Sequence, residues 1–290
     1  MADFERLLDE TSRTFALAIR LLPEPTRRDV TLAYLLFRLA DTLEDGLARP
    51  KAQRKAALVD LARLLRNKNA VRSEIQISVD LSAAVTESPA CSELVAQQGE
   101  LLAAIDRSEP AVREMILTHA AKTAEQMAGF LAQATESGQL QLRTLDELRA
   151  YCYAVAGIVG ELLTELFLYR SPTLGHVARE LRSEAPFFGE GLQLVNILRD
   201  AEDDARDRRS YLPPEVDRQQ LFQLAAADLA AADRYTATLL EANAPPGVVR
   251  FTKLPVVLAR ATLQAVEREG PGIKLDRQRV LRILQEVRGT

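Results

Sequence analysis

Several residue types from which functional sites are commonly built are scarce in this sequence. Its 290 residues include no tryptophan, two cysteines and two histidines. Cys91 and Cys152 lie far apart, so we expect no disulfide framework, and a reducing cytosol is the default compartment. His119 and His176 are also isolated, and these four residues show no zinc-ligand spacing. Disulfide-stabilised and zinc-dependent classes of protein are therefore not favoured.

Long apolar runs and an excess of positive charge are missing as well. No uninterrupted apolar stretch approaches the roughly 20 residues of a membrane-spanning helix, and the first residues contain no apolar signal region. The net charge of -4 and the pI near 5.5 argue against nucleic acid as the main partner, because phosphate backbones are bound by a clustered excess of Lys and Arg. We expect a cytoplasmic protein, with at most a peripheral contact with the inner face of a membrane.

Helical periodicity runs through nearly the whole chain. Apolar residues recur at spacings of three and four, which predicts helices over residues 12–21, 26–45, 51–66, 91–104, 110–136, 145–170, 175–204, 217–241, 248–268 and 276–288. Only residues 74–79 alternate like a strand, and a helical turn or irregular connection fits them equally well. No long Ser/Gly/Pro linker and no repeat of fixed period divides the chain. The pattern predicts a single all-α domain over residues 1–290.

Two acidic pairs stand at the ends of apolar helical runs. Asp41 and Asp45 form the first pair, and Asp200 and Asp204 form the second. Aspartates four residues apart lie on one face of a helix, where like charges are destabilising, so a multivalent cation between the pairs would explain them. Each pair ends a row of polar residues at helical spacing, which we call a stripe. The first stripe is Tyr34, Arg38, Asp41 and Asp45, and the second is Gln193, Asn196, Asp200 and Asp204, with Arg199 next to Asp200.

The residue types in these stripes fit a diphosphate site. Carboxylates in a helical cleft suit Mg²⁺, which uses few carboxylates and keeps waters and substrate phosphate oxygens as its other ligands. Arginine suits phosphate because its planar fork donates paired hydrogen bonds. Either pair alone is better explained as a solvated helix end, but two such pairs with Arg or Asn in register favour a site. We expect the two acidic helices to face each other. A nearby basic cluster, Arg206, Arg208 and Arg209, also suits a small anion.

A third segment, residues 151–165, carries two glycines within a predicted helix. Each costs about 1 kcal/mol relative to Ala, so each needs a reason. One reading is close helix packing through Gly157 and Gly160. The other is that Ala154, Gly157 and Gly160 make room for a long apolar ligand, with Tyr151 at the edge of the channel.

Together these residues resemble the squalene/phytoene synthase family, from about Ser12 to about Thr262. Ser12–Pro23 is similar to the family's opening helix. Tyr34–Asp45 resembles its first aspartate-rich motif, in the spelling of squalene synthases. Residues 151–160 resemble the segment with the catalytic tyrosine, and residues 193–204 with Tyr211-Leu-Pro213 resemble the second aspartate-rich motif and its loop.

The resemblance implies an isoprenoid-synthase-type helical bundle around a central cavity, and a Mg²⁺-dependent prenyltransferase. Two farnesyl diphosphates would condense head to head. One loses diphosphate to give an allylic cation, and the double bond of the other attacks it, giving a cyclopropylcarbinyl diphosphate. After a second ionisation and rearrangement, squalene synthases add hydride from NADPH, whereas phytoene and dehydrosqualene synthases lose a proton.

The resemblance also assigns roles by motif register. The Mg²⁺ ligands would be Asp41, Asp45, Asn196, Asp200 and Asp204, assisted by Gln193. The diphosphate contacts would be Ser12, Arg13, Thr14, Tyr34, Arg38 and Arg199, with Tyr211 also binding substrate. Tyr151 would handle a proton or stabilise a cation. The tunnel for the prenyl chains would be lined by Phe15, Ala154, Val155, Val159 and Leu162.

The product is less tightly specified than the site. Two stretches, Asp41–Asp45 and Leu254–Leu263, look closer to squalene synthases, so we expect squalene as the product and NADPH as the reductant. The sequence has no Gly-x-Gly-x-x-Gly motif that would indicate a Rossmann-type site for NADPH. The Lys-Ile-Arg stretch that lies near the reductant in the family appears here as Lys274-Leu-Asp276, without the arginine. The alternatives are a phytoene, dehydrosqualene or presqualene diphosphate synthase, a non-catalytic helical assembly factor, and a head-to-tail prenyltransferase or class I terpene cyclase. The last two families lack the Tyr151 segment and the Ser12–Phe15 opening.

Overall fold

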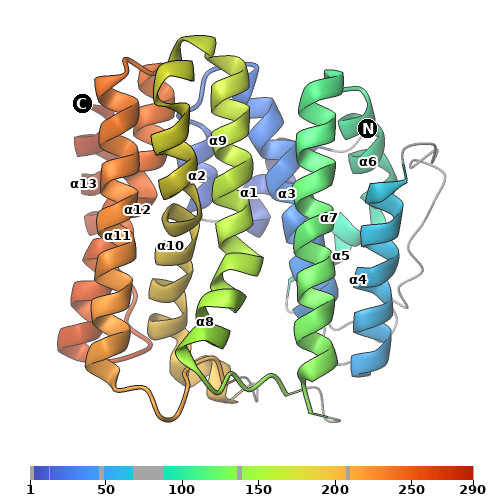
Figure 1. Ribbon diagram of the computed structural model, residues 1–290, viewed down its shortest axis with the longest axis vertical. Coiled ribbons are helices and arrows are strands. Elements are labelled where there is room, and N and C mark those ends of the chain that lie inside the picture. The colour runs from blue at the N-terminus through green and yellow to red at the C-terminus, as the bar shows by residue number, and fades with distance from the viewer. Residues whose placement is uncertain are drawn as a thin grey trace. The chain divides into compact units, whose positions relative to one another are not determined.

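The computed structural model describes residues 3–12, 14–45, 49–67, 88–135, 139–206 and 210–289. Within these ranges the regular structure is helical, apart from an isolated parallel bridge between Gln141 and Ser210, so the predicted all-α class is confirmed (Figure 1). The chain divides into two compact units. The N-terminal unit is Met1–Leu17 with Glu24–Gly138, and the C-terminal unit is Ala18–Pro23 with Gln139–Thr290. A single domain over residues 1–290 stays a prediction.

The N-terminal unit is built around one long helix, α3. Its elements are α1 (Phe4–Thr11), the first residues of α2 (Phe15–Ile19), α3 (Thr26–Asp45), α4 (Lys51–Arg66), α5 (Pro89–Ala96), α6 (Gln98–Asp106) and α7 (Pro110–Gln133). Helix α3 packs against α1, α4, α5, α6 and α7, and α4 lies along α7. Because neighbours cover most of α3, whatever polar edge it retains is held on a rigid support.

The apolar faces of α3 explain that central place. Leu35, Leu36, Leu39 and Leu43 are completely buried. Asp41 is half-buried and Asp45 is exposed. Burying four leucines completely stabilises the helix by several kcal/mol at about 1.5–3 kcal/mol each, which outweighs a like-charge pair costing tenths of a kcal/mol.

The C-terminal unit is built around α10. Its elements are α8 (Leu145–Cys152), the π-helical turn η2 (Tyr153–Gly157), α9 (Ile158–Arg170), the 3₁₀ helix η3 (Pro172–Val177), α10 (Ala178–Arg206), α11 (Arg218–Glu241), α12 (Pro246–Glu269) and α13 (Arg277–Arg288). Helix α10 contacts α8, η2, α9, η3, α11 and α12. In Figure 1, α10, α11 and α12 run side by side, as their contacts require.

Most predicted helix boundaries agree with the structure, and the differences are local. The predicted helices 26–45 and 51–66 are observed with those bounds as α3 and α4. The predicted helix 91–104 is divided at Gln97, the predicted helix 145–170 contains the π-helical turn, and α1 was not predicted. The alternating residues 74–79 lie outside the described residues.

Glycines allow η2 and α9 to touch α10 backbone to backbone. A Cβ on Gly160 would overlap the carbonyl oxygen of Ala185, and a Cβ on Gly189 would overlap that of Ala156. A Cβ on Gly157 would lie 2.7 Å from the Tyr153 ring and 3.3 Å from Glu190 Oε1. Of the two readings of these glycines, the structure therefore favours close helix packing.

Substituting Gly160 tests this contact. We expect Gly160→Ala to destabilise the protein by roughly 1–3 kcal/mol, because the added methyl group overlaps the backbone carbonyl of Ala185, which cannot rotate aside as a side chain could. The matched control is Gly129→Ala in α7, where nothing lies within 4 Å of the added Cβ, and which should stabilise by about 1 kcal/mol. Thermal unfolding measures both, and equal effects of the two substitutions would contradict the packing account.

Candidate functional site

The first polar stripe forms a connected set of contacts along α3. The Tyr34 hydroxyl donates to the Thr11 carbonyl oxygen at 3.0 Å, and its ring stacks on Phe15 with centroids 5.8 Å apart. One turn further, Arg38 Nη1 lies 3.8 Å from Asp41 Oδ2. The opening segment and α3 therefore come together at Tyr34.

The remaining predicted residues of the opening segment are less involved. The Ser12 hydroxyl accepts a hydrogen bond from the Phe15 N–H at 3.1 Å, which caps the start of α2. Thr14 is exposed, and Arg13 lies outside the described residues. Of this segment, Phe15 contacts the stripe, through its stacking on the Tyr34 ring.

The electrostatics of the stripe favour a bound cation. Burial raises the pKa of Asp41 to about 7, Arg38 opposes the rise, and the neighbouring charge of Asp45 adds to it. Since the Asp41 side chain keeps 37% of its surface exposed, water weakens the shift. A divalent cation beside the pair would remove the repulsion that favours the protonated form.

The second stripe lies on α10 and is held by its own arginine. Arg199 Nε donates to Asp200 Oδ1 at 2.7 Å, and Arg199 Nη2 donates to Asp200 Oδ2, so the fork grips both carboxylate oxygens. The hydrogen bond that Arg199 donates to Asp200 raises the pKa of Arg199 against the effect of burial. Along the stripe, Gln193 and Asp204 are half-buried and Asn196 is exposed.

Each stripe supplies a donor set that suits Mg²⁺. Among the described residues, no three His, Cys, Asp or Glu side chains are close enough to hold a metal ion. Mg²⁺ does not need such a cage, because one or two carboxylates together with waters and substrate phosphate oxygens complete its octahedron. The pair of carboxylates in each stripe, next to an arginine that suits phosphate, meets that requirement.

The structure pairs the predicted catalytic tyrosine with a second tyrosine. The Tyr151 hydroxyl donates to the Tyr211 hydroxyl at 3.2 Å, and the rings stack with centroids 4.8 Å apart. Two backbone hydrogen bonds at the Gln141–Ser210 bridge fix the loop just before Tyr211: Leu142 N to Ser210 O and Ser210 N to Leu140 O, each 3.0 Å. Tyr151 is only 4% exposed, so its hydroxyl is oriented by this partner rather than by bulk water.

The predicted tunnel residues of the C-terminal unit divide by burial. Ala154 and Leu162 are completely buried, whereas Val155 and Val159 are half-buried. Their spacing puts Tyr151, Val155 and Val159 along one side of the helix. The half-buried valines are thus the ones with surface to offer an apolar ligand.

A buried charge cluster joins α8, α10 and α11, and the sequence reasoning missed it. Arg149 Nη2 donates to Glu190 Oε2 at 3.2 Å, and Arg149 Nη1 lies 3.5 Å from Asp228 Oδ1. The two acid side chains are 7% and 6% exposed, and one oxygen of Asp228 has no hydrogen-bond partner among the described residues. The sequence does contain an indication of this cluster. Glu190 is the one charged residue in the apolar stretch that precedes Gln193, and it lies three residues before Gln193.

One arginine shared by two buried acids leaves an excess of negative charge. Burial raises the pKa of Glu190 to about 7; Arg149 opposes the rise, while Asp228 and Glu161 add to it. The same burial raises the pKa of Asp228. A proton is therefore retained in the folded cluster at pH values where the unfolded chain has released it.

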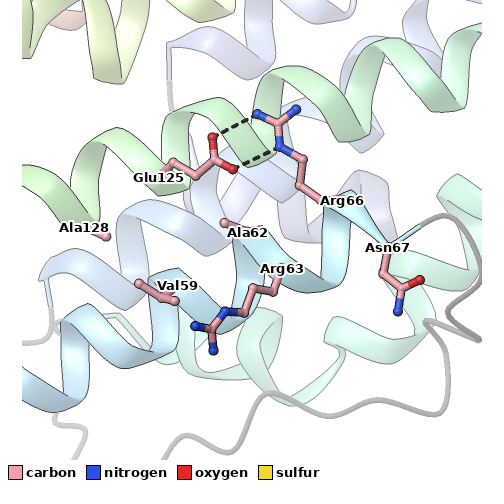
Figure 2. Close-up of a pocket in the computed structure, with 7 residues that line it drawn as sticks. All are labelled: Val59, Ala62, Arg63, Arg66, Asn67, Glu125 and Ala128. Atoms are coloured by element: carbon pink, nitrogen blue, oxygen red, sulfur yellow. Dashed lines mark hydrogen bonds and ion pairs between the residues drawn. The ribbon is translucent and has the colours of Figure 1, made fainter.

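A shallow pocket lies elsewhere, between α4 and α7 of the N-terminal unit (Figure 2). It has a volume of about 500 Å³, and Arg66 crosses it to grip Glu125 with two hydrogen bonds of 2.9 Å. Its other lining residues are Val59, Ala62, Arg63, Asn67 and Ala128. None of the predicted site residues lines it, so it is separate from the two stripes.

One helical stretch, Leu145–Arg170, is long and apolar enough to cross a membrane by length and composition. Its most apolar window is 61% buried within the protein, and core helices of soluble proteins pass the same test. The stretch contains the Tyr151 segment and packs against α10, so its apolar composition is explained by packing within the C-terminal unit.

The fold places the chain in the class of all-helical isoprenoid synthases. A solved structure of TcSQS with a bound ligand matches with a TM-score of 0.75 and 25% identity, covering 98% of this chain and 85% of that one. A dehydrosqualene synthase in complex with ligand shares the fold, with a TM-score of 0.64 and 21% identity, covering 99% of this chain and 94% of that one.

Sequence comparison gives the family. The chain belongs to the squalene/phytoene synthase family, whose profile matches residues 8–233. The squalene synthase of Schizosaccharomyces pombe is 27% identical over 91% of this chain and 59% of its own length. That of Eremothecium gossypii is 30% identical over 73% of this chain and 45% of its own length. The matched part thus spans about half the length of these relatives, and the resemblance drawn from the motifs is confirmed at the level of family.

The Arg149 cluster predicts an unusual pH dependence of stability. Because the pKa of Glu190 is raised in the folded state, stability should fall as pH rises from about 4.5 to 7. Glu190→Gln mimics the protonated acid. We expect the free energy of unfolding of this variant to fall by roughly 1–3 kcal/mol less over this pH range than that of the unsubstituted protein.

Thermal unfolding between pH 5 and pH 8 measures the slope. The control is Glu184→Gln. Glu184 lies on the same helix and pairs with the exposed Arg234, so this variant should show the same slope of stability against pH as the unsubstituted protein. A Glu190→Gln protein with an unchanged slope would contradict the account.

Proposed function

We propose that this protein condenses two farnesyl diphosphates head to head, through presqualene diphosphate, to a C30 product, which is squalene when NADPH is present. The observation that carries the proposal is the repeated stripe: on α3 and again on α10, paired aspartates stand with an arginine held against one of them. Membership of the squalene/phytoene synthase family and the named function of its relatives support it.

In this proposal the two stripes face each other across one cavity and share a diphosphate. Asp41, Asp45, Asn196, Asp200 and Asp204 would hold Mg²⁺, with Gln193 assisting. Bound Mg²⁺ supplies positive charge that stabilises the departing diphosphate. The chain's own residues bind the substrate's phosphates and keep water from the carbocation.

The arginines have a specific part. Arg199 donates to both carboxylate oxygens of Asp200, through Nε and Nη2. With Asp200 engaged by a cation, the guanidinium would be free to turn the same two donors to phosphate oxygens, a geometry that it matches well. Arg38 lies 3.8 Å from Asp41 and donates its other terminal nitrogen to Cys91 Sγ at 3.5 Å, and it would make the corresponding contact with phosphate.

The tyrosine pair would act after diphosphate has left. Tyr151 would hold or transfer a proton at its hydroxyl, or stabilise the cation with its ring. Tyr211 accepts the hydrogen bond from Tyr151 and so fixes which way that hydroxyl points. The half-buried valines Val155 and Val159, with Phe15, Ala154 and Leu162, would line the path of the prenyl chains.

The end of the reaction depends on the reductant. Asp276 stands at the position of the arginine in the family's Lys-Ile-Arg stretch. Its side chain accepts a hydrogen bond from the Arg279 N–H at 2.7 Å and so caps the start of α13. An aspartate engaged as a helix cap does not contribute positive charge to NADPH. Hydride delivery would rely on Lys274, which is exposed. If it fails, the product from farnesyl diphosphate is dehydrosqualene or presqualene diphosphate; phytoene would require the C20 diphosphate as substrate. We further propose a cytoplasmic protein with peripheral membrane contact for product release.

A product assay tests the proposal. Purified protein is incubated with farnesyl diphosphate and Mg²⁺, with and without NADPH, and the extracted lipids are analysed; a parallel series uses the C20 diphosphate. We expect squalene with NADPH. Products unchanged by NADPH would remove the squalene assignment, and the lack of any C30 product would remove the C15 substrate.

Neutralising the stripes tests their role in catalysis. We expect Asp41→Asn and Asp200→Asn each to lower kcat by roughly 100-fold or more, because a metal clamp on a leaving diphosphate contributes several kcal/mol. Asp203→Asn is the control: it lies off the stripe and pairs with Arg206 at 2.8 Å, so the rate should stay unchanged. An unchanged kcat in both stripe variants would contradict the proposed role of the stripes. A non-catalytic assembly factor would be favoured if the unsubstituted protein gave no product and both variants kept its function.

A further inference from the structure

The end of α3 is gripped by two buried arginines. In a helix the last four carbonyl oxygens lack partners within the helix, and in α3 these belong to residues 42–45. Arg49 Nη2 donates to the Thr42 carbonyl oxygen at 2.9 Å and lies 3.5 Å from that of Leu43. Arg54 Nη1, from α4, donates to the Glu44 carbonyl oxygen at 2.8 Å. Side chains from outside α3 thus hold three of its four terminal carbonyls.

Burial makes this arrangement costly unless something compensates it. Arg49 and Arg54 are each only 4% exposed, and they lie near enough for Arg54 to lower the pKa of Arg49 further than burial alone does. Arg49 Nε is buried with no hydrogen-bond partner among the described residues. Two like charges buried together need negative charge close by. The negative end of the α3 dipole, where these carbonyl oxygens lie, supplies it.

We propose that Arg49 and Arg54 are positioning residues for the first aspartate pair. They hold the last turn of α3, which otherwise frays, and so keep Asp45, its final residue, in register with Asp41 one turn before. This inference rests on the proposed function, because it assumes that the pair binds a divalent cation.

Metal binding, rather than activity, tests it first. Mn²⁺ stands in for Mg²⁺, and the EPR signal of the free ion is followed with and without inorganic diphosphate. We expect Arg54→Met and Arg49→Met to weaken Mn²⁺ binding by about tenfold, as loss of supporting contacts to metal ligands commonly does. Arg54→Lys, which keeps a donor, should restore part of the loss. Arg63→Met, on α4 but 78% exposed, is the matched control and should bind as the unsubstituted protein does.

Hydrogen exchange supplies a readout that needs no variant to fold. In the unsubstituted, metal-free protein, amides of residues 42–45 should be as protected as those in the middle of α3. Fast exchange there would overturn the inference, as would Met variants that fold and bind Mn²⁺ normally. If the unsubstituted protein binds Mn²⁺ but the variants match it, only this inference fails. If the unsubstituted protein binds no Mn²⁺, the inference fails together with the proposed function.

Discussion

Repulsion between two carboxylates one turn apart on a helix is the constraint that shapes this protein. Such a pair lowers helix stability by tenths of a kcal/mol and recurs on α3 and α10. In each case an arginine lies against one of the two aspartates, Arg38 on Asp41 and Arg199 on Asp200. On α3 two further arginines grip the end of the helix. The surroundings therefore hold one aspartate of each pair, Asp41 and Asp200, with an arginine.

Rigid support is the second requirement, and each unit meets it differently. Helix α3 is wrapped by five helices and buries its leucines completely. Helix α10 is approached so closely by η2 and α9 that glycines stand at the contact. A π-helical turn within the Tyr151 segment is in keeping with a functional position, because such turns are frequent at functional sites. The acid side chains are thereby presented on supports that resist bending.

The sequence predicted the helical class and the two stripes because both depend on local spacing. Helices α3 and α4 were predicted to the residue, since leucine periodicity and the flanking breaks coincide there. The Tyr151–Tyr211 bond, the Arg149 cluster and the arginines on the end of α3 were not predicted. Each joins residues distant in sequence or reaches a backbone carbonyl, and periodicity carries no information about either. The readings of Gly157 and Gly160 also needed the structure, because a small residue serves a ligand and a neighbouring backbone equally well.

The central claim of the proposed function is that the stripes on α3 and α10 would bind one cation–diphosphate group together. A crystal structure with Mn²⁺ and a non-ionisable thiolo analogue of farnesyl diphosphate tests it most directly, because anomalous scattering locates each ion. The account predicts ions bound to Asp41 or Asp45 and to Asp200 or Asp204, joined by one shared diphosphate that Arg38 or Arg199 also contacts. Ions on separate surfaces, with the diphosphate away from both stripes, would contradict it.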